Sequence, residues 1–330
     1  MKEKEFTLYA PGEYAYPAAF GFEPFLHSYL HEDEEIRPVM IIAPGGGYRF
    51  VSPSEGEIVA RSFFDKGWNC FVLTYSINML DLAPLNAQPL HDISRTVRFV
   101  RKNAASFSVD PAKLAVCGFS AAGHLCASLA VHYMDDEETN PEYQDISNKP
   151  QAAVLSYPVI TSGEYAHRDS FTALLGAEAS EEMLHYMSLE TQVTKDTVPC
   201  FLWQTATDEL VPVENSYLMA EALKKQGIPF AHHVFTDGKH GISVATQDWA
   251  DHKFAPDYTM RQNRMIGEAV KNGTVSLPEA QKERVLGMLA FMNGEIDPET
   301  LPGDFRSYPN AEAAVWPVLA DQWLRKIFEM

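Results

Sequence analysis

Short, continuous runs of apolar and β-branched residues recur along most of the chain. They occupy positions 38–43, 68–75, 114–117, 152–160, 200–206 and 231–235. A run without polar alternation is typical of a strand that is buried on both faces, as strands of parallel sheets are. The pattern therefore predicts a series of central strands.

Segments with helical character separate these runs. They lie at 52–66, 91–105, 121–133 and 213–226. Strands that alternate with helices at this spacing need crossover connections, so the chain predicts an α/β architecture with a mostly parallel, doubly wound sheet and helices on both faces. Residues 5–30 alternate and carry aromatic side chains, which predicts antiparallel strands leading into that sheet.

Two further stretches depart from the simple alternation. Residues 168–190 carry helical fragments, which we expect to form a lid-like excursion over the site. Residues 247–310 predict a helical insertion before the last helix, near 311–328, within one domain spanning 1–330. The insertion contains a predicted helix at 257–271 and a second from 276. The apolar face of the second comprises Val285, Leu286, Leu289 and Met292.

An insertion at this place has three interpretations. It is compatible with a cap over a site, with a subunit interface in a homo-oligomer, and with packing on the domain's own surface. The pattern of residues does not choose among them.

Composition narrows the class of partner. The formal net charge is −19, which disfavours nucleic acid and anionic membrane surfaces as partners. No apolar stretch approaches the roughly 20 residues that span a bilayer, and the start of the chain lacks the apolar core of a signal peptide. The four cysteines, Cys70, Cys117, Cys126 and Cys200, have no paired or metal-ligand spacing and predict buried free thiols. Together these features predict a cytoplasmic protein.

The helix at 91–105 carries a basic run. Ile93, Val97 and Val100 are expected on its buried side. Arg95, Arg98, Arg101 and Lys102 are expected to point toward solvent, as a hydrated face rather than an anion site.

The strand at 114–117 breaks at Gly118 and continues as a helix from Ala121, with Ser120 between them. A serine in a tight strand-to-helix turn with small neighbours is the pattern of a nucleophile elbow. The turn forces the serine into a strained backbone conformation, so that Gly118 and Ala122 come too close together for large side chains. An ordinary Gly-Ser turn is the alternative, because a glycine, a serine and a small residue at this spacing are by themselves a weak signal.

Three glycines, Gly45 to Gly47, follow directly after the strand at 38–43. Without Cβ atoms, their backbone N–H groups are able to approach a ligand closely. In a hydrolase with an elbow, this loop and the residue after the nucleophile supply the oxyanion hole. The predicted donors are Gly46 or Gly47, together with Ala121. A flexible glycine turn is the alternative.

An elbow serine needs a base and an orienting carboxylate, because an isolated hydroxyl is a poor nucleophile near neutral pH. Asp208 follows the strand at 200–206, and His240 follows the strand at 231–235. Parallel α/β sheets place their sites at these carboxyl ends, so we predict Ser120, Asp208 and His240 as a catalytic triad.

Other residues compete for two of these roles. Glu209 is the second choice for the acid, and Asp237 a weaker one. His124 lies on the elbow helix and is expected to be packed beneath the site. The positions of His167, His185 and His252 in the sequence do not exclude them as the base.

The chain resembles the xylan-esterase-like, or acetyl esterase, branch of the carbohydrate esterases within the α/β-hydrolase superfamily. The stretches that carry the resemblance are 44–48, 55–56, 71–75, 118–125, 205–212 and 239–241. Two positions depart from the usual pattern: Ala122 replaces a glycine, and Pro44 stands where many related esterases carry histidine. The resemblance implies an α/β-hydrolase fold and hydrolysis of short-chain, chiefly acetyl, esters without a metal or an organic cofactor.

We therefore expect a serine carboxylesterase acting on a small ester, with an acetylated oligosaccharide as the favoured substrate. A serine peptidase or an acyltransferase would use the same three residues, so the sequence does not separate them. A catalytically silent binding protein on the same fold is the alternative from another class.

Overall fold

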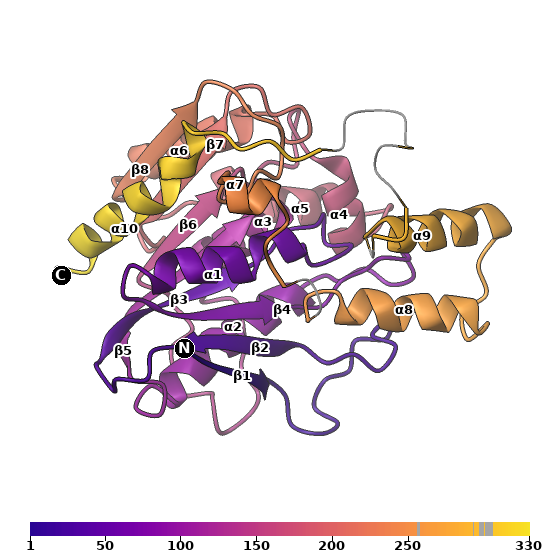
Figure 1. The fold of residues 1–330 in the computed structure, drawn as a ribbon, viewed down its shortest axis with the longest axis horizontal. Helices are drawn as coiled ribbons and strands as arrows, with labels where there is room; N and C mark the ends of the chain where they lie inside the picture. Colours follow the sequence, from indigo (N-terminus) through magenta and orange to yellow (C-terminus); the bar gives the residue numbers. More distant parts are fainter. Residues whose placement is uncertain (256–257, 293, 297–299, 301–305) are drawn as a thin grey trace.

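The computed structural model describes residues 1–255, 258–292, 294–296, 300 and 306–330. In this part of the chain, eight strands form one sheet in the order β1-β2-β4-β3-β5-β6-β7-β8 (Figure 1). The strands are β1 (Lys2–Thr7), β2 (Phe25–Leu30), β3 (Arg37–Ala43), β4 (Asn69–Thr74), β5 (Val109–Phe119), β6 (Ala152–Ser156), β7 (Cys200–Thr205) and β8 (Phe230–Phe235).

The sheet is mostly parallel, as predicted. β2 pairs antiparallel with both β1 and β4, and the pairs from β4 through β3, β5, β6 and β7 to β8 are parallel. Alternate residues of β3 enter different cores: Val39 and Ile41 join one apolar cluster, whereas Met40 and Ile42 join the other. Both faces of the sheet are thus covered, which explains why its central strands read as continuous apolar runs.

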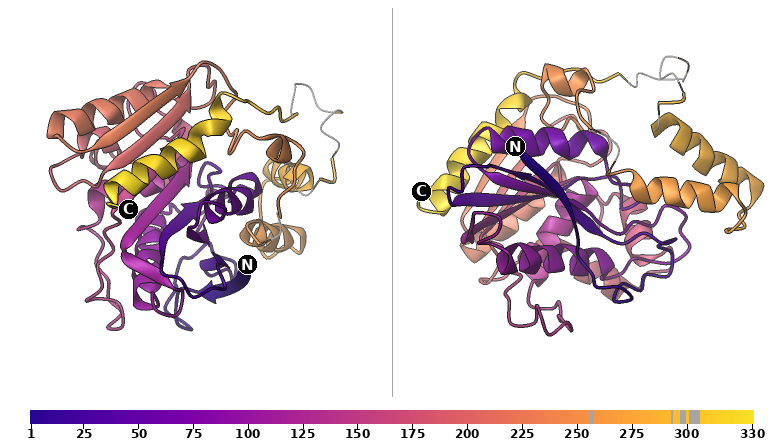
Figure 2. Two further views of the ribbon diagram at one scale, coloured as in Figure 1. Left: turned by 60° about the vertical axis from the view of Figure 1, so that its left-hand side comes forward. Right: turned by 60° about the horizontal axis from the view of Figure 1, so that its bottom comes forward.

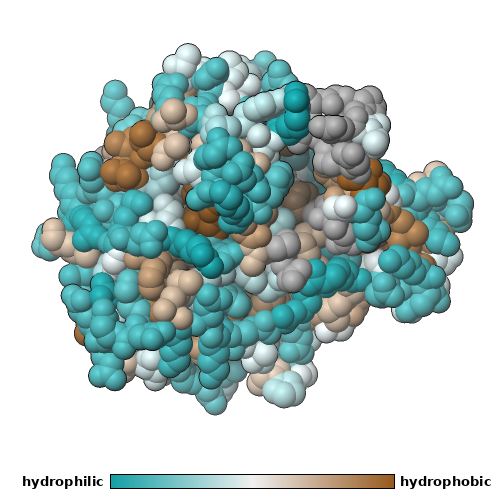
Figure 3. Space-filling model, in the orientation of Figure 1, coloured by the Kyte–Doolittle hydropathy of each residue, from teal (hydrophilic) through white to brown (hydrophobic). Residues whose placement is uncertain are grey.

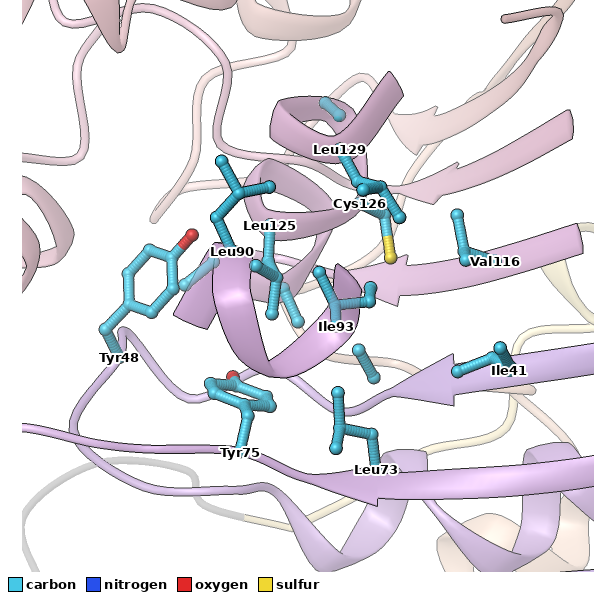
Figure 4. Packing of buried hydrophobic residues seen from close by; sticks show 14 of the residues in the cluster. Ile41, Tyr48, Leu73, Tyr75, Leu90, Ile93, Val116, Leu125, Cys126 and Leu129 are labelled. Carbon is cyan, nitrogen blue, oxygen red and sulfur yellow. The ribbon is translucent and has the colours of Figure 1, made fainter. Parts of the chain in front are cut away.

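Helices cover each face of the sheet (Figure 2). α2 (Gln88–Lys102), α3 (Ala121–His132) and α6 (Glu214–Gln226) supply apolar side chains to the first cluster. Leu125, Cys126 and Leu129 of α3 belong to the same cluster as Ile41 and Val116 of the sheet (Figure 4). α1 (Glu57–Phe64) and α10 (Trp316–Ile327) cover the opposite face.

The four cysteines are buried free thiols, as predicted. The described helices include none long and apolar enough to cross a membrane.

The predicted strand at 152–160 is too long. β6 ends at Ser156 because the next residue, Tyr157, adopts a left-handed backbone angle (φ 36°) and Pro158 follows. Proline lacks the N–H that would continue the ladder of hydrogen bonds. The chain then enters the predicted helical fragments, which the structure places at α4 (Arg168–Leu175) and α5 (Glu181–Tyr186).

The segment after β8 contains α7 (Gln247–Ala250), α8 (Arg261–Lys271) and α9 (Glu279–Met292). α8 and α9 lie side by side at one end of the molecule, where hydrophobic side chains gather on the surface shown in Figure 3. The predicted helix at 257–271 begins at Arg261, and Asp257 lies outside the described residues.

The α8–α9 pair packs on the body of the protein. Gln262 of α8 accepts a hydrogen bond from the N–H of Ile77 (3.1 Å), and Asn263 donates to the carbonyl of Arg49 (3.3 Å). Val285 and Leu289 of α9 are buried in the first cluster, as predicted, whereas the side chain of Met292 lies outside the described residues. A cap or an interface role for 247–310 stays a prediction.

The expectation of a solvated basic face on α2 is wrong for two of its four residues. Arg95 and Arg98 are only 5% and 6% exposed. Arg95 pairs with Glu13 and Glu138, and Arg98 donates to Asp136 (2.7 Å). The N-terminal segment and the loop after α3 fold over this side of the helix and bring those carboxylates with them. Arg101 is half-buried and Lys102 exposed.

We predict that Arg98→Met lowers the free energy of unfolding by about 3 kcal/mol, because it leaves the Asp136 carboxylate buried with one partner fewer. Chemical denaturation measures the change. Lys102→Met on the exposed side of the same helix is the control and is expected to leave stability unchanged, since its ion pair with Glu142 lies in solvent. Equal losses in both variants would contradict the buried pair.

Candidate active site

Ser120 occupies the sharp turn between β5 and α3. Its backbone angles are φ 54° and ψ −120°, outside the regions that L-residues favour. A Cβ atom added at Gly118 would lie 2.0 Å from the carbonyl oxygen of Ala122, and one at Gly123 would lie 2.7 Å from the Cβ of Pro158. The helix therefore rests directly against the strand and against Pro158, and the strain at Ser120 is the consequence.

The structure brings the three predicted catalytic residues together. The Nε2 atom of His240 lies 2.8 Å from the Oγ of Ser120, and its Nδ1 lies 2.7 Å from Oδ2 of Asp208. A neutral imidazole that donates from Nδ1 to the carboxylate leaves Nε2 as an acceptor for the serine proton. This is the arrangement a serine nucleophile needs for activation.

Hydrogen bonds and burial hold the Asp208 carboxylate in place beside His240. Its Oδ1 accepts hydrogen bonds from the N–H groups of Leu210 (3.0 Å) and Val211 (2.9 Å), and its side chain is 1% exposed. The alternative acids, Glu209 and Asp237, are exposed. In the contacts described, His240 pairs with Asp208 and with neither of them.

The other histidines have different surroundings. His124 is buried beneath the site, where it pairs with the hydroxyl of Tyr48 and the carbonyl of Met187, each at 2.9 Å. Burial lowers its pKa to about 4. His167 pairs with Ser170 (2.8 Å), and burial and then the nearby His240 lower its pKa.

Ser120 Oγ pairs with His240, and the described contacts do not join it to His167, His185 or His252.

The glycine loop approaches the elbow closely. A Cβ atom added at Gly45 would lie 3.0 Å from the Cβ of Ser120. The N–H of Gly45 donates to Oε2 of Glu55 (2.7 Å). Within the described contacts, the N–H groups of Gly46, Gly47 and Ala121 have no protein acceptor, which is compatible with their predicted use as oxyanion donors. That role stays a prediction.

Two residues beside the site were missed in the sequence. Glu55 and Tyr157 are 3% and 2% exposed, and the Tyr157 hydroxyl donates to Oε1 of Glu55 (2.6 Å). The ring of Tyr157 packs edge-on against His240, with 5.0 Å between centroids. Glu55 stands in a polar stretch of sequence that is typical of an exposed turn. The only signal for it was that Glu55-Gly56 is one of the stretches that resemble the esterase family.

His240 also lines a cavity of about 510 Å³. The loop 237–242 and the segment 306–310 form two of its walls. The side chains of Trp249, His252 and Phe254 form another. Over the described residues, no group of three His, Cys, Asp or Glu side chains is arranged to hold a metal ion.

Comparison with known proteins gives consistent results. The model of the BD-FAE family matches residues 26–223. The chain is 50% identical over 259 residues to endo-1,4-beta-xylanase B of Butyrivibrio fibrisolvens, a match that covers 77% of this chain and 41% of the relative. It is 27% identical over 224 residues to an acetylxylan esterase of Xylanibacter ruminicola, covering 66% of this chain and 43% of that protein. The chain thus spans less than half the length of both relatives.

Solved structures agree in fold. The crystal structure of an acetyl ester-xyloside bifunctional hydrolase from Caldicellulosiruptor lactoaceticus has 32% identity and a TM-score of 0.69. The match covers 83% of this chain and 97% of the other. Two hydrolase structures at 24% and 22% identity also match with a TM-score of 0.63, and this likeness concerns the fold alone. The α/β-hydrolase fold expected from the resemblance is confirmed.

We predict a stability loss in acid that depends on His124. Its pKa is about 4 in the folded protein against 6.5 for an ordinary histidine, so between these values the unfolded chain binds a proton that the folded protein excludes. The free energy of unfolding should fall by about 3 kcal/mol as pH drops from 6.5 to 4. Denaturation across this range should show a shallower slope in His124→Gln. An unchanged slope would contradict the pKa assigned to the buried ring.

Proposed function

This chain belongs to the BD-FAE family of α/β-hydrolases, and on that premise we propose that it is a serine carboxylesterase that removes acetyl groups from oligosaccharides. The observation that carries the proposal is the unbroken line of hydrogen bonds from Ser120 through His240 to Asp208. The backbone of the turn between β5 and α3 holds Ser120 in position beside His240.

The proposed reaction follows from this geometry. Ser120 Oγ attacks the acyl carbonyl carbon while Nε2 of His240 takes the hydroxyl proton, and Asp208 stabilises the imidazolium. The N–H groups of Ala121 and of Gly46 or Gly47 bind the oxyanion, each worth about 10²–10³ in rate. Collapse of the intermediate breaks the C–O bond, and His240 gives its proton to the leaving alcohol. A water molecule, deprotonated by His240, then attacks the acetyl ester on Ser120, the ester C–O bond breaks, and His240 returns the proton to Ser120 Oγ as the acid leaves.

The substrate class is supported by the relatives. One is named for an acetylxylan esterase, one for a xylanase, and a solved structure for an acetyl ester-xyloside hydrolase. All three names concern xylan or its fragments, and two concern acetyl esters. An acetylated xylo-oligosaccharide is therefore our proposed substrate.

The cavity beside His240 offers a place for the sugar. The histidine that protonates the leaving alcohol also lines this cavity, so the alcohol's remaining rings need space on that side. Tyr308 borders the cavity with 47% of its surface exposed. Aromatic side chains provide apolar contact area for ligands that also carry polar groups.

We predict that Ser120→Ala lowers kcat for p-nitrophenyl acetate by about 10⁶. Ser216→Ala, a buried serine on α6, is the matched control and should retain activity. Comparison with the butyrate and octanoate esters should show a preference for acetate. Equal, negligible rates in wild type and Ser120→Ala would overturn the esterase and leave a binding protein. Products that partition to an added alcohol or amine would instead indicate an acyltransferase.

We predict that Tyr308→Ala raises KM for an acetylated xylo-oligosaccharide about tenfold and leaves p-nitrophenyl acetate hydrolysis unchanged, because the sugar chain extends across the cavity to Tyr308 whereas the single p-nitrophenyl ring stays beside His240. Tyr217→Ala removes a tyrosine of the same exposure, 47%, on α6 and serves as the control. Steady-state assays with both substrates make the comparison. Equal effects of the two tyrosine variants on the oligosaccharide would place the sugar elsewhere.

A further inference from the structure

A buried glutamate stands directly behind the glycine loop. Oε2 of Glu55 accepts the N–H of Gly45 at 2.7 Å, and a Cβ at Gly45 would lie 3.0 Å from both this oxygen and the Cβ of Ser120. Glu55 thus binds the part of the loop that touches the nucleophile's residue. The reaction sequence proposed above gives it no step.

The second oxygen of Glu55 is linked to the loop that carries His240. Oε1 accepts the hydroxyl proton of Tyr157 at 2.6 Å, and the oxygen of Tyr157 in turn accepts the N–H of Ser243 at 3.1 Å. Ser243 lies three residues after His240, whose ring contacts the Tyr157 ring. The hydroxyl of Ser243 also donates to the carbonyl of Ser54 (2.6 Å), next to Glu55.

These bonds form one continuous connection. It runs from the glycine loop, through the Glu55 carboxylate and the Tyr157 hydroxyl, to the loop that carries His240. The first loop holds the predicted oxyanion donors Gly46 and Gly47, the second holds the predicted base, and both lie beside Ser120.

We propose that Glu55 and Tyr157 are a positioning pair that sets the glycine loop and the His240 loop at their working separation around Ser120. The inference rests on the proposed esterase function and adds to it the residues that hold its two halves together. Glu55 acts through the backbone of Gly45, and Tyr157 acts through Ser243 and the face of the imidazole.

The hydrogen bond from Gly45 to Glu55 also determines which N–H groups remain for the oxyanion. Because the Gly45 N–H is bound to Glu55, the next two N–H groups of the loop are the ones left for substrate. The amide of Glu55→Gln keeps one oxygen for the two donors that the carboxylate accepts, so either Gly45 or Tyr157 loses its acceptor and its loop is free to shift. Electrostatic stabilisation of an oxyanion depends on donors that are already in place, so this freedom should reduce kcat.

Burial is consistent with a dedicated role. It raises the pKa of Glu55, and the hydrogen bonds from Tyr157 and Gly45 and the nearby His240 oppose that shift. An ionisable group buried beside a site is a candidate for function, although ion-pair and hydrogen-bond networks of the scaffold show the same property. The test must therefore separate positioning from stability.

The chain offers a matched control pair. The Tyr9 hydroxyl donates to Oδ1 of Asp92 at 2.7 Å, and Asp92 is fully buried on α2 with further bonds from Ser76. This pair repeats the chemistry of Tyr157 and Glu55 without any described contact with Ser120, His240 or the glycine loop. Asp92→Asn and Tyr9→Phe thus match Glu55→Gln and Tyr157→Phe.

The experiment measures kcat and KM for p-nitrophenyl acetate, the inhibition constant of a trifluoromethyl ketone and Tm in all four variants. The ketone is a suitable probe because Ser120 would add to its carbonyl and place an oxyanion in the hole. Glu55→Gln and Tyr157→Phe should each lower kcat about 10-fold or more and weaken ketone binding by a similar factor, with KM within about twofold of wild type. The control pair should change Tm alone.

The inference is overturned if the Glu55 and Tyr157 variants affect kcat and ketone binding no more than the controls. Loss of the fold in both, with the controls folded, would assign the pair to stability and overturn it equally. Ser120→Ala, assayed in parallel, keeps this separate from the proposed function. If that variant loses activity while Glu55→Gln keeps it, the esterase stands and only the positioning pair fails.

Discussion

The site depends on one close contact, that between β5 and α3 on either side of Ser120. Two glycines make it possible, because a Cβ at Gly118 would strike the Ala122 carbonyl and one at Gly123 would strike Pro158. With those side chains absent, the helix begins immediately after the strand, and Ser120 must take up a left-handed backbone angle. Its N–H is bound to the carbonyl of Ser156 (3.0 Å), which leaves the hydroxyl as the group that faces the loops.

The sheet then assembles the remaining groups from distant parts of the chain. His240 lies 120 residues from Ser120 and 32 from Asp208, yet both side chains come within 2.8 Å of its ring. Parallel strands bring their carboxyl ends to one edge, so the loops after β3, β5, β7 and β8 meet there. This is why order along the chain was enough to predict which residues would meet.

Sequence reasoning succeeded where a general rule of sequence or fold applies, and it failed for buried polar contacts that no such rule anticipates. Continuous apolar runs predicted the central strands, and the elbow pattern predicted the turn at Ser120. The burial of Arg98 was missed because its partner, Asp136, comes from a loop 38 residues away that folds over the helix. The bond between Glu55 and Tyr157 spans 102 residues, and neither residue's neighbours in sequence carry a sign of it.

Those missed residues share a physical property, since each is a polar or charged group kept in the interior by hydrogen bonds. Burying such groups is costly, and apolar side chains of similar size often serve stability as well or better. What directional bonds add is a defined distance between the segments that they join. The Tyr9–Asp92 bond fixes the distance between α2 and the N-terminal segment, which both belong to the scaffold. The Glu55–Tyr157 bond instead connects the two loops beside Ser120, where, on the proposed mechanism, we expect a small displacement to change catalysis more than stability.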